Sequence, residues 1–209
     1  MKRILYFSMV ALAAIVLASC QKKDVCRIHG TVVGEQYEGK RIFLVPFTGP
    51  ATAETVDSVE IKNGKFEFTP DSMQMYKILL DYHYRLGTQP LLVIAEPGDI
   101  QVVIDTVSSA VGTPQNDSLQ VWKELTEKHR RKYSDLMRPA LAKNDTAKIK
   151  ELDRTVHIPY KNRSRVMAAN MEGTILGDFL KGMFPLTYKR KMPDGTIVTM
   201  NADTHEPVE

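Results

Sequence analysis

Cysteine is scarce in this chain of 209 residues, which holds only Cys20 and Cys26. The two do not form a CxxC pair, so the sequence provides no disulfide scaffold, no thioredoxin-type redox centre and no four-cysteine zinc site. The five histidines show neither HxH nor HExxH spacing, and no glycine-rich phosphate loop or GxSxG nucleophile elbow is present. We therefore expect no catalytic residue, no metal and no cofactor other than a covalent lipid.

Long apolar runs and a strong charge of one sign are also missing. Only residues 4–16 form an apolar run, which has the length of a secretory signal and is too short for a comfortable bilayer span. The formal charge is +3, of which Lys2 and Arg3 supply two. We therefore expect no nucleic-acid partner, and interpret the basic clusters at 128–132 and 189–191 as solvated faces, with lipid-headgroup or glycan contact as the alternative.

The apolar run ends in Leu17-Ala18-Ser19-Cys20, which resembles the lipobox of bacterial lipoproteins. We expect residues 1–19 to be a signal peptide, Cys20 to carry the lipid and residues 20–26 to form a tether to the membrane. The alternative is a plain cleaved signal or an uncleaved anchor. Because Gln21 rather than Asp follows Cys20, the usual sorting pattern favours the outer membrane of the cell envelope, on its periplasmic or its outer face.

After lipidation Cys26 would be the remaining free thiol. We expect a buried or membrane-proximal structural role for it, and an intermolecular disulfide with another envelope protein is the alternative.

Residues 27–115 show the alternation of short strands, and the Asn63-Gly64 hairpin turn is the clearest local signal. The sequence predicts an antiparallel β-sandwich in this region. The predicted strands cover residues 28–33, 41–46, 55–61, 65–68, 76–81, 91–95, 100–105 and 109–111.

Residues 116–182 change to a helical period, so the predicted fold class is α+β, a sandwich followed by a helical hairpin. The first helix is expected to be capped by Asn116 or Asp117 and to be ended by Pro139 and the Asn144-Asp145 pair. The second is expected to be disturbed at Pro159 and to continue towards Asn170, and a short third helix covers 171–182. Residues 183–209 are expected to form a hairpin around a turn at 193–195, with the last eight residues frayed.

Two groups of residues are candidate binding sites. Tyr82, His83, Tyr84 and Arg85 combine aromatic and polar side chains that could bind a sugar or a peptide, although an ordinary edge strand has the same pattern. The stripe of Leu119, Trp122 and Leu125 could dock a partner, although a stripe at this spacing is usually intramolecular core.

Several short motifs, taken in order, resemble a known family. They are Ile28-His29-Gly30, Val56-Asp57-Ser58, residues 63–68, residues 96–100 and residues 111–117. Together they resemble domain of unknown function 4369 over about residues 24–120. The resemblance implies a lipoprotein of Bacteroidota-type envelopes, in which this module often precedes a TlpA/ResA-like thioredoxin domain. Residues 184–200 are only faintly similar to the first hairpin of such a domain, and the CxxC pair is missing, so we do not expect reductase activity.

These expectations combine into one functional hypothesis. The sequence favours a non-enzymatic, lipid-anchored envelope protein that acts as an interaction or scaffold module, with an envelope protein or a small ligand as partner. The alternatives are a lipoprotein that binds a glycan or a peptide, and an accessory subunit of a separate thiol-disulfide reductase that would act through a mixed disulfide at Cys26.

Overall fold

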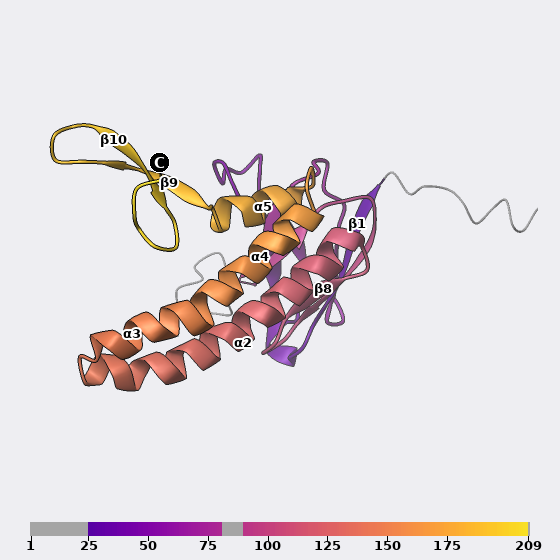
Figure 1. The fold of residues 1–209 in the computed structure, drawn as a ribbon. Helices are drawn as coiled ribbons and strands as arrows, with labels where there is room; N and C mark the ends of the chain where they lie inside the picture. Colours follow the sequence, from indigo (N-terminus) through magenta and orange to yellow (C-terminus); the bar gives the residue numbers. More distant parts are fainter. Residues whose placement is uncertain (1–24, 81–89, 209) are drawn as a thin grey trace, which may run out of the picture.

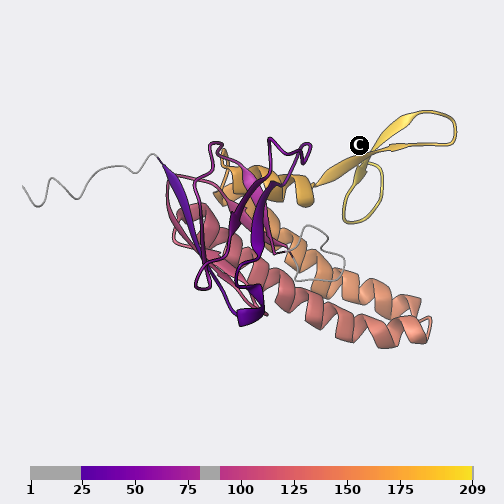
Figure 2. The same cartoon turned by 180° about the vertical axis from the view of Figure 1, so that it is seen from behind.

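The computed structural model describes residues 25–80 and 90–208, which form an α+β fold. Two four-stranded sheets are followed by a set of helices and by a two-stranded sheet near the C-terminus. The helices lie on one side of the sheets, and the C-terminal hairpin projects away from them (Figure 1, Figure 2). The predicted fold class, with strands first and helices after them, is confirmed.

Each of the eight strands in the two larger sheets lies within two residues of its predicted range. The first sheet has the order β4-β1-β7-β8, and the second has the order β3-β2-β5-β6. The first contains β1 (Cys26–Val32), β4 (Lys65–Phe68), β7 (Gly98–Ile104) and β8 (Ser109–Val111). The second contains β2 (Arg41–Pro46), β3 (Asp57–Glu60), β5 (Met75–Leu79) and β6 (Leu91–Ile94). A 3-10 turn, η1 (Glu35–Tyr37), lies between β1 and β2.

One strand pair departs from the antiparallel arrangement that the sequence predicts. Strand β1 pairs in parallel with β7, with Ile28 beside Ile100 and Val32 beside Ile104. Parallel neighbours need a long crossover connection, and here the strands of the second sheet lie within that crossover. Alternation identifies a strand but not the direction of a distant neighbour, so the antiparallel prediction is wrong for this pair.

The predicted Asn63-Gly64 turn is present and has an additional role. Asn63 and Gly64 adopt positive φ values of 53° and 67°, as a type I′ turn requires. The carboxylate of Glu38 accepts hydrogen bonds from both N–H groups, at 2.7 and 2.9 Å, and these bonds lower the pKa of Glu38. Because β3 and β4 belong to different sheets, the turn carries the chain from one sheet to the other.

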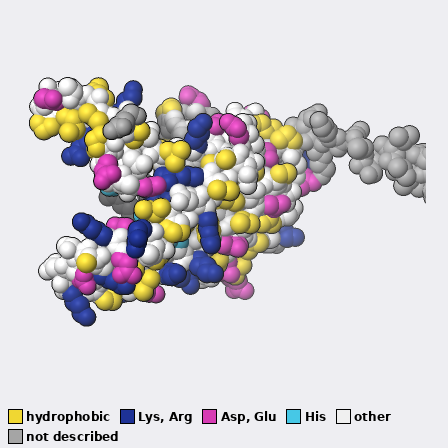
Figure 3. Space-filling view, in the orientation of Figure 1, with side chains coloured by type: hydrophobic (Ala, Val, Ile, Leu, Met, Phe, Trp, Pro, Cys, Tyr) yellow, Lys and Arg dark blue, Asp and Glu magenta, His cyan; other side chains and the backbone are white. Residues whose placement is uncertain are grey.

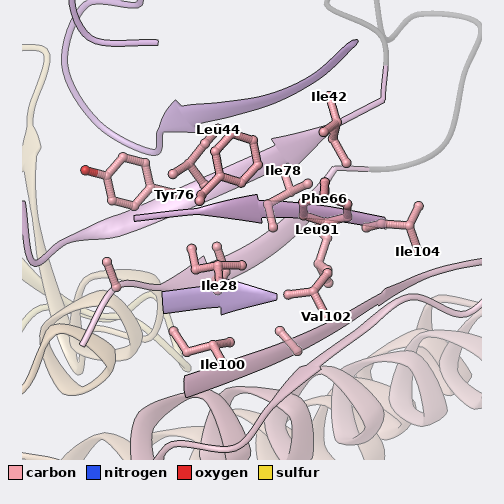
Figure 4. Packing of buried hydrophobic residues seen from close by; sticks show 14 of the residues in the cluster. Ile28, Ile42, Leu44, Phe66, Tyr76, Ile78, Leu91, Ile100, Val102 and Ile104 are labelled. Atoms are coloured by element: carbon pink, nitrogen blue, oxygen red, sulfur yellow. The ribbon is translucent and has the colours of Figure 1, made fainter. Parts of the chain in front are cut away.

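The interior of the sandwich is built from the alternate side chains of both sheets. In β4, Phe66 and Phe68 are buried while Lys65 and Glu67 are exposed, as the alternation predicts. Figure 4 shows how side chains from the two sheets meet in the space between them. The buried cluster includes Ile28, Ile100, Val102 and Ile104 of the first sheet and Ile42, Leu44, Ile78 and Leu91 of the second.

The first helix, α2 (Pro114–Ala142), begins before its predicted caps and ends between Pro139 and the Asn144-Asp145 pair, as predicted. Thr113 occupies the N-cap position and Pro114 the first helical position, where the fixed φ of proline fits and no N–H is needed. The predicted caps Asn116 and Asp117 therefore lie inside the helix. Pro139 lies in its last turn, three residues before the final helical residue Ala142.

The second predicted helix is divided into three parts. These are α3 (Thr146–Leu152), a π-helical turn η3 (Asp153–His157) and α4 (Ile158–Asn170). The disturbance predicted at Pro159 takes this form, since Pro159 lies in the first turn of α4 and the wider π turn precedes it. The third helix is α5 (Ile175–Met183).

The C-terminal segment forms the predicted hairpin, with strands β9 (Thr187–Lys191) and β10 (Ile197–Asn201). The fraying expected of the last eight residues is not observed over 202–208. The N–H of Asn201 donates to the carbonyl of Glu206 at 2.8 Å, and the N–H of Val208 donates to the carbonyl of Thr199 at 2.9 Å. These residues therefore fold back along the outer edge of β10.

Candidate interaction site

The sandwich is joined to α2 by a network of buried polar side chains. The carboxylate of Glu96 accepts hydrogen bonds from the N–H groups of Gln115 and Asn116, at 2.7 and 3.3 Å, in the first turn of the helix. The buried amide of Asn116 donates to the carbonyl of Ile94 at 2.7 Å and accepts from its N–H at 2.9 Å. First-turn N–H groups have no partner within their own helix, so these bonds fix how α2 leaves the sandwich.

The helical stripe that the sequence offers as a docking surface lies in the interior of the protein. Leu119 and Trp122 expose only 1% and 6% of their surface, and Leu125 is half-buried. Leu119 and Trp122 pack in a second core with Met75 and Ile94 of the second sheet. From α5, Leu176 and Leu180 complete this core. A partner could reach this stripe only by opening that core, so the alternative of intramolecular packing is the one observed.

Of the other candidate residues, the structure describes only Cys26. Tyr82, His83, Tyr84 and Arg85 lie outside the described residues, as does Cys20. Cys26 lies in β1 with 1% of its surface exposed, and burial raises the pKa of its thiol. A buried thiol with a raised pKa forms little of the reactive thiolate, so a mixed disulfide through Cys26 is unfavourable.

A group of polar aromatic side chains, which we call the histidine seam, joins α2 to η3 and α4. It consists of His129 and Tyr133 of α2, His157 of η3 and Tyr160 of α4. His129 Nε2 lies 3.1 Å from His157 Nδ1, and the His129 ring stacks on that of Tyr160 with a centroid distance of 4.1 Å. The hydroxyl of Tyr133 donates to the carboxylate of Asp153.

The seam shifts the protonation of its members. Burial, followed by the charge of the neighbouring His157, lowers the pKa of His129, and burial lowers that of His157. Burial, followed by the bond to Asp153, raises the pKa of Tyr133 to about 12. Sequence reasoning treated each histidine separately and missed the pair, because nothing in linear spacing identifies two residues that a helical hairpin brings together.

Two hollows are present in the described part of the molecule. A shallow groove of about 390 Å³ follows α2 beside the seam and includes His129, Tyr133 and Met137 in its lining. A larger cavity of about 620 Å³ lies at one end of the sandwich, where residues 48–57 approach residues 69–74. Its lining carries hydroxyl groups together with the carboxylates of Glu54, Asp57 and Asp71.

A cluster of charged side chains holds the C-terminal segment against α4. The carboxylate of Asp203 accepts a two-pronged hydrogen bond from Arg165 and forms an ion pair with Lys161. These partners, Arg165 first, lower the pKa of Asp203 to about 2. Arg165 also donates to the carbonyls of Phe184 and Pro185 at 3.1 and 2.8 Å. Both ends of the hairpin are thereby fixed to one turn of the helix.

The hairpin itself exposes apolar and basic side chains. Leu186 and Ile197 each expose 68% of their surface, and Val208 is also exposed. Strand β9 carries the sequence Thr-Tyr-Lys-Arg-Lys, in which the three basic residues are all exposed. Figure 3 shows yellow apolar and dark-blue basic side chains close together on this projecting part. Two-stranded sheets are marginally stable alone, so a hairpin that exposes such groups has the features of a contact surface.

Two searches within the described residues gave negative findings. No three His, Cys, Asp or Glu side chains gather there in an arrangement that could hold a metal ion. No helix there combines the length and the apolar character needed to cross a membrane.

Residues 26–119 match a family model described as Domain of unknown function (DUF4369). This stretch of the chain resembles the DUF4369 family. The match covers all eight strands of the sandwich and the start of α2, so the motifs that suggested the family belong to the sandwich and to its junction with the helix. Neither the curated proteins nor the solved structures searched gave a match. The match to DUF4369 assigns no chemistry to these residues.

Proposed function

We propose that this protein is a non-enzymatic, lipid-anchored module of the cell envelope that binds another envelope protein through its C-terminal hairpin. The observation that carries the proposal is the exposure of Leu186 and Ile197 on a hairpin that the Asp203 cluster holds in a fixed position. A fixed surface loses less conformational entropy on binding than a mobile tail does, which favours association.

The lipid anchor is the second part of the proposal. The sequence around Cys20 supports lipidation, and two or three acyl chains at about 0.8 kcal/mol per buried methylene would hold the chain stably at a membrane. Residue Gln21 favours the outer membrane. The hairpin and β1 lie on opposite sides of the described fold (Figure 1), so a tether before β1 would leave the contact surface directed away from it.

The anchor is tested by intact mass and membrane fractionation in a host that lipidates proteins. We expect the full chain to carry the acyl mass and to fractionate with membranes. The Cys20→Ala variant should lose both properties, and the matched Cys26→Ala variant should keep them. Acylation that persists in Cys20→Ala would overturn the assignment of the anchor.

The contact surface is tested by site-specific photo-crosslinking in the same cells. A photoreactive phenylalanine analogue at Ile197 should give a discrete adduct that mass spectrometry identifies as one envelope protein. The same analogue at Val107, which is exposed on a sandwich loop, is the matched control. Equal adducts at both positions, or none at Ile197, would contradict the proposed role of the hairpin.

A second candidate function is the binding of a glycan or a peptide at the cavity of about 620 Å³. Its lining of hydroxyl and carboxylate groups favours a ligand rich in hydrogen-bond donors. The hydroxyl of Tyr76 and the amide of Gln74, which are hydrogen-bonded at 3.0 Å, lie in its lining. Titration with an oligosaccharide should shift the NMR signals of these two groups. Gln74→Ala should weaken oligosaccharide binding. The control variant Gln101→Ala, on the other sheet, should bind like the parent chain.

A further inference from the structure

The hairpin has one edge that is covered and one that is open. Residues 206–208 lie along the outer edge of β10, where Asn201 and Thr199 bond to Glu206 and Val208. Strand β9 has β10 on one side and no other strand of the described chain on the other side. Open edges in natural sheets are usually short, bulged or covered, because they can pair with another chain.

The register of the hairpin shows which backbone groups are open. The N–H of Met192 donates to the carbonyl of Thr196, and that of Ala202 donates to the carbonyl of Leu186. Because bonded pairs alternate along an antiparallel ladder, Tyr188 and Arg190 bond to β10. The N–H and C=O groups of Lys189 and Lys191 therefore point away from β10, towards the open side.

The side chains on this edge have one sign of charge. Lys189, Arg190 and Lys191 are exposed, and none of them forms an ion pair with the described residues. Lys189 and Lys191 lie on the same face of the hairpin as Ile197, which stands opposite Lys191 in the register. A strand paired with β9 would therefore meet basic groups flanked by an apolar side chain.

We propose that β9 binds an extended acidic segment of a partner protein by strand addition, which deepens the proposed function and rests on it. Main-chain bonds to Lys189 and Lys191 would supply the pairing, and acidic side chains on the same face as Lys189 and Lys191 would supply the selectivity. A second copy of this chain is an unsuitable occupant, because pairing β9 with its own copy would place these cations against one another.

The test uses the full chain in detergent micelles and two synthetic peptides of alternating sequence, one of glutamate and valine and one of lysine and valine. The glutamate peptide should bind, and the lysine peptide should not. The variant K189E/K191E should weaken binding of the glutamate peptide by about tenfold, since each cross-strand pair contributes a few-fold. The matched variant K128E/K132E changes the same charge on α2 and should bind like the parent chain.

Amide hydrogen exchange distinguishes strand addition from simple charge attraction. The amides of Lys189 and Lys191 should exchange quickly in the free chain and become protected when the glutamate peptide binds. Those of Tyr188 and Arg190, already bonded to β10, should be protected in both states. Binding that leaves Lys189 and Lys191 unprotected would overturn strand addition.

Three further outcomes would also overturn it. They are equal binding of the two peptides, binding of anionic phospholipid vesicles but of neither peptide, and concentration-dependent dimerisation that K189E/K191E abolishes. The Ile197 crosslink is an independent readout of the proposed function. A crosslink that persists without peptide binding would leave the interaction module standing and remove the acidic strand.

Discussion

Between the two sheets of the sandwich the buried side chains are mainly aliphatic and phenyl groups. Between α2 and the helices beside it lie the half-buried His129, Tyr133 and His157 and the buried Tyr160. The first interior gains its stability from removal of apolar surface from water, which depends little on pH. The second depends on directional contacts between titratable groups. The two halves should therefore respond differently to mutation and to acid.

The junction between the halves combines both principles. Trp122 and Leu119 pack against the outer face of the second sheet, while Glu96 and Asn116 bond the start of α2 to the end of β6. Such a junction holds the helices in a fixed direction relative to the sandwich, although the histidine seam between the helices consists of only four side chains. The predictions below separate the sandwich, the junction, the hairpin anchor and the seam.

The largest effect is expected in the sandwich. Phe68→Ala should lower the free energy of unfolding by about 3–5 kcal/mol, because it removes a fully buried ring and leaves a cavity. Val103→Ala, on the outward face of the same sheet, should change it by less than about 0.5 kcal/mol. Urea unfolding followed by circular dichroism measures both. Equal effects of the two substitutions on the free energy of unfolding would contradict the burial of Phe68 in the sandwich core.

The junction should be the next most sensitive region. Asn116→Ala leaves the N–H and the carbonyl of Ile94 without their side-chain partner, at a cost of about 2–3 kcal/mol. The fluorescence of Trp122, the single tryptophan of the chain, should then change at lower urea than the sandwich signal. Gln120→Ala, one turn further along α2, should leave the two transitions together. A single unshifted transition in Asn116→Ala would show that the network does not couple the halves.

The anchor of the hairpin should give a smaller and local effect. Asp203→Asn leaves Lys161 and Arg165 without their common carboxylate, so amide exchange over residues 186–208 should speed up about tenfold while the sandwich is unchanged. Glu206→Gln, in the same exposed segment, is the matched control. Faster exchange in the control, or a sandwich unfolding transition shifted to lower urea in Asp203→Asn, would contradict a local anchor.

The same anchor should fail in strong acid. The pKa of Asp203 lies at about 2 in the folded chain and near its ordinary value of 3.8 in the unfolded chain. Its contribution to stability is therefore complete above about pH 4 and is lost as the pH falls through 2. This window lies well below that of the histidine seam.

The contrast between the halves also explains how far the sequence could predict the structure. In the sandwich, side chains such as Phe66 and Phe68 alternate strictly, and turn residues such as Asn63-Gly64 have one low-cost conformation. Local patterns therefore located every strand. The parallel pairing of β1 with β7 joins residues far apart in the chain and has no local signature.

The candidate site was predicted less well for the same reason. The turn at 193–195 predicts the hairpin, but its exposure depends on Arg165 and Asp203, which are far apart in sequence. The stripe of Leu119 and Trp122 has the pattern of any amphipathic helix, and only the position of α5 shows that it is covered. Periodicity indicates that a face is apolar, and it does not indicate what packs against that face.

The smallest expected effect concerns the seam near neutral pH. Folding lowers the pKa of His129 below the ordinary value of 6.5 through burial and the charge of His157, and it lowers that of His157 through burial and the charge of Lys161. The unfolded chain therefore binds more protons as the pH falls through about 6.5, and the free energy of unfolding decreases until the folded pKa values are reached. Both rings are partly exposed, so we expect a loss of less than about 1 kcal/mol. The melting temperature between pH 7.5 and 5 measures it. The H129Q/H157Q variant should flatten this dependence. An unchanged profile in this double variant would show that the seam is not the pH-sensitive part of the molecule.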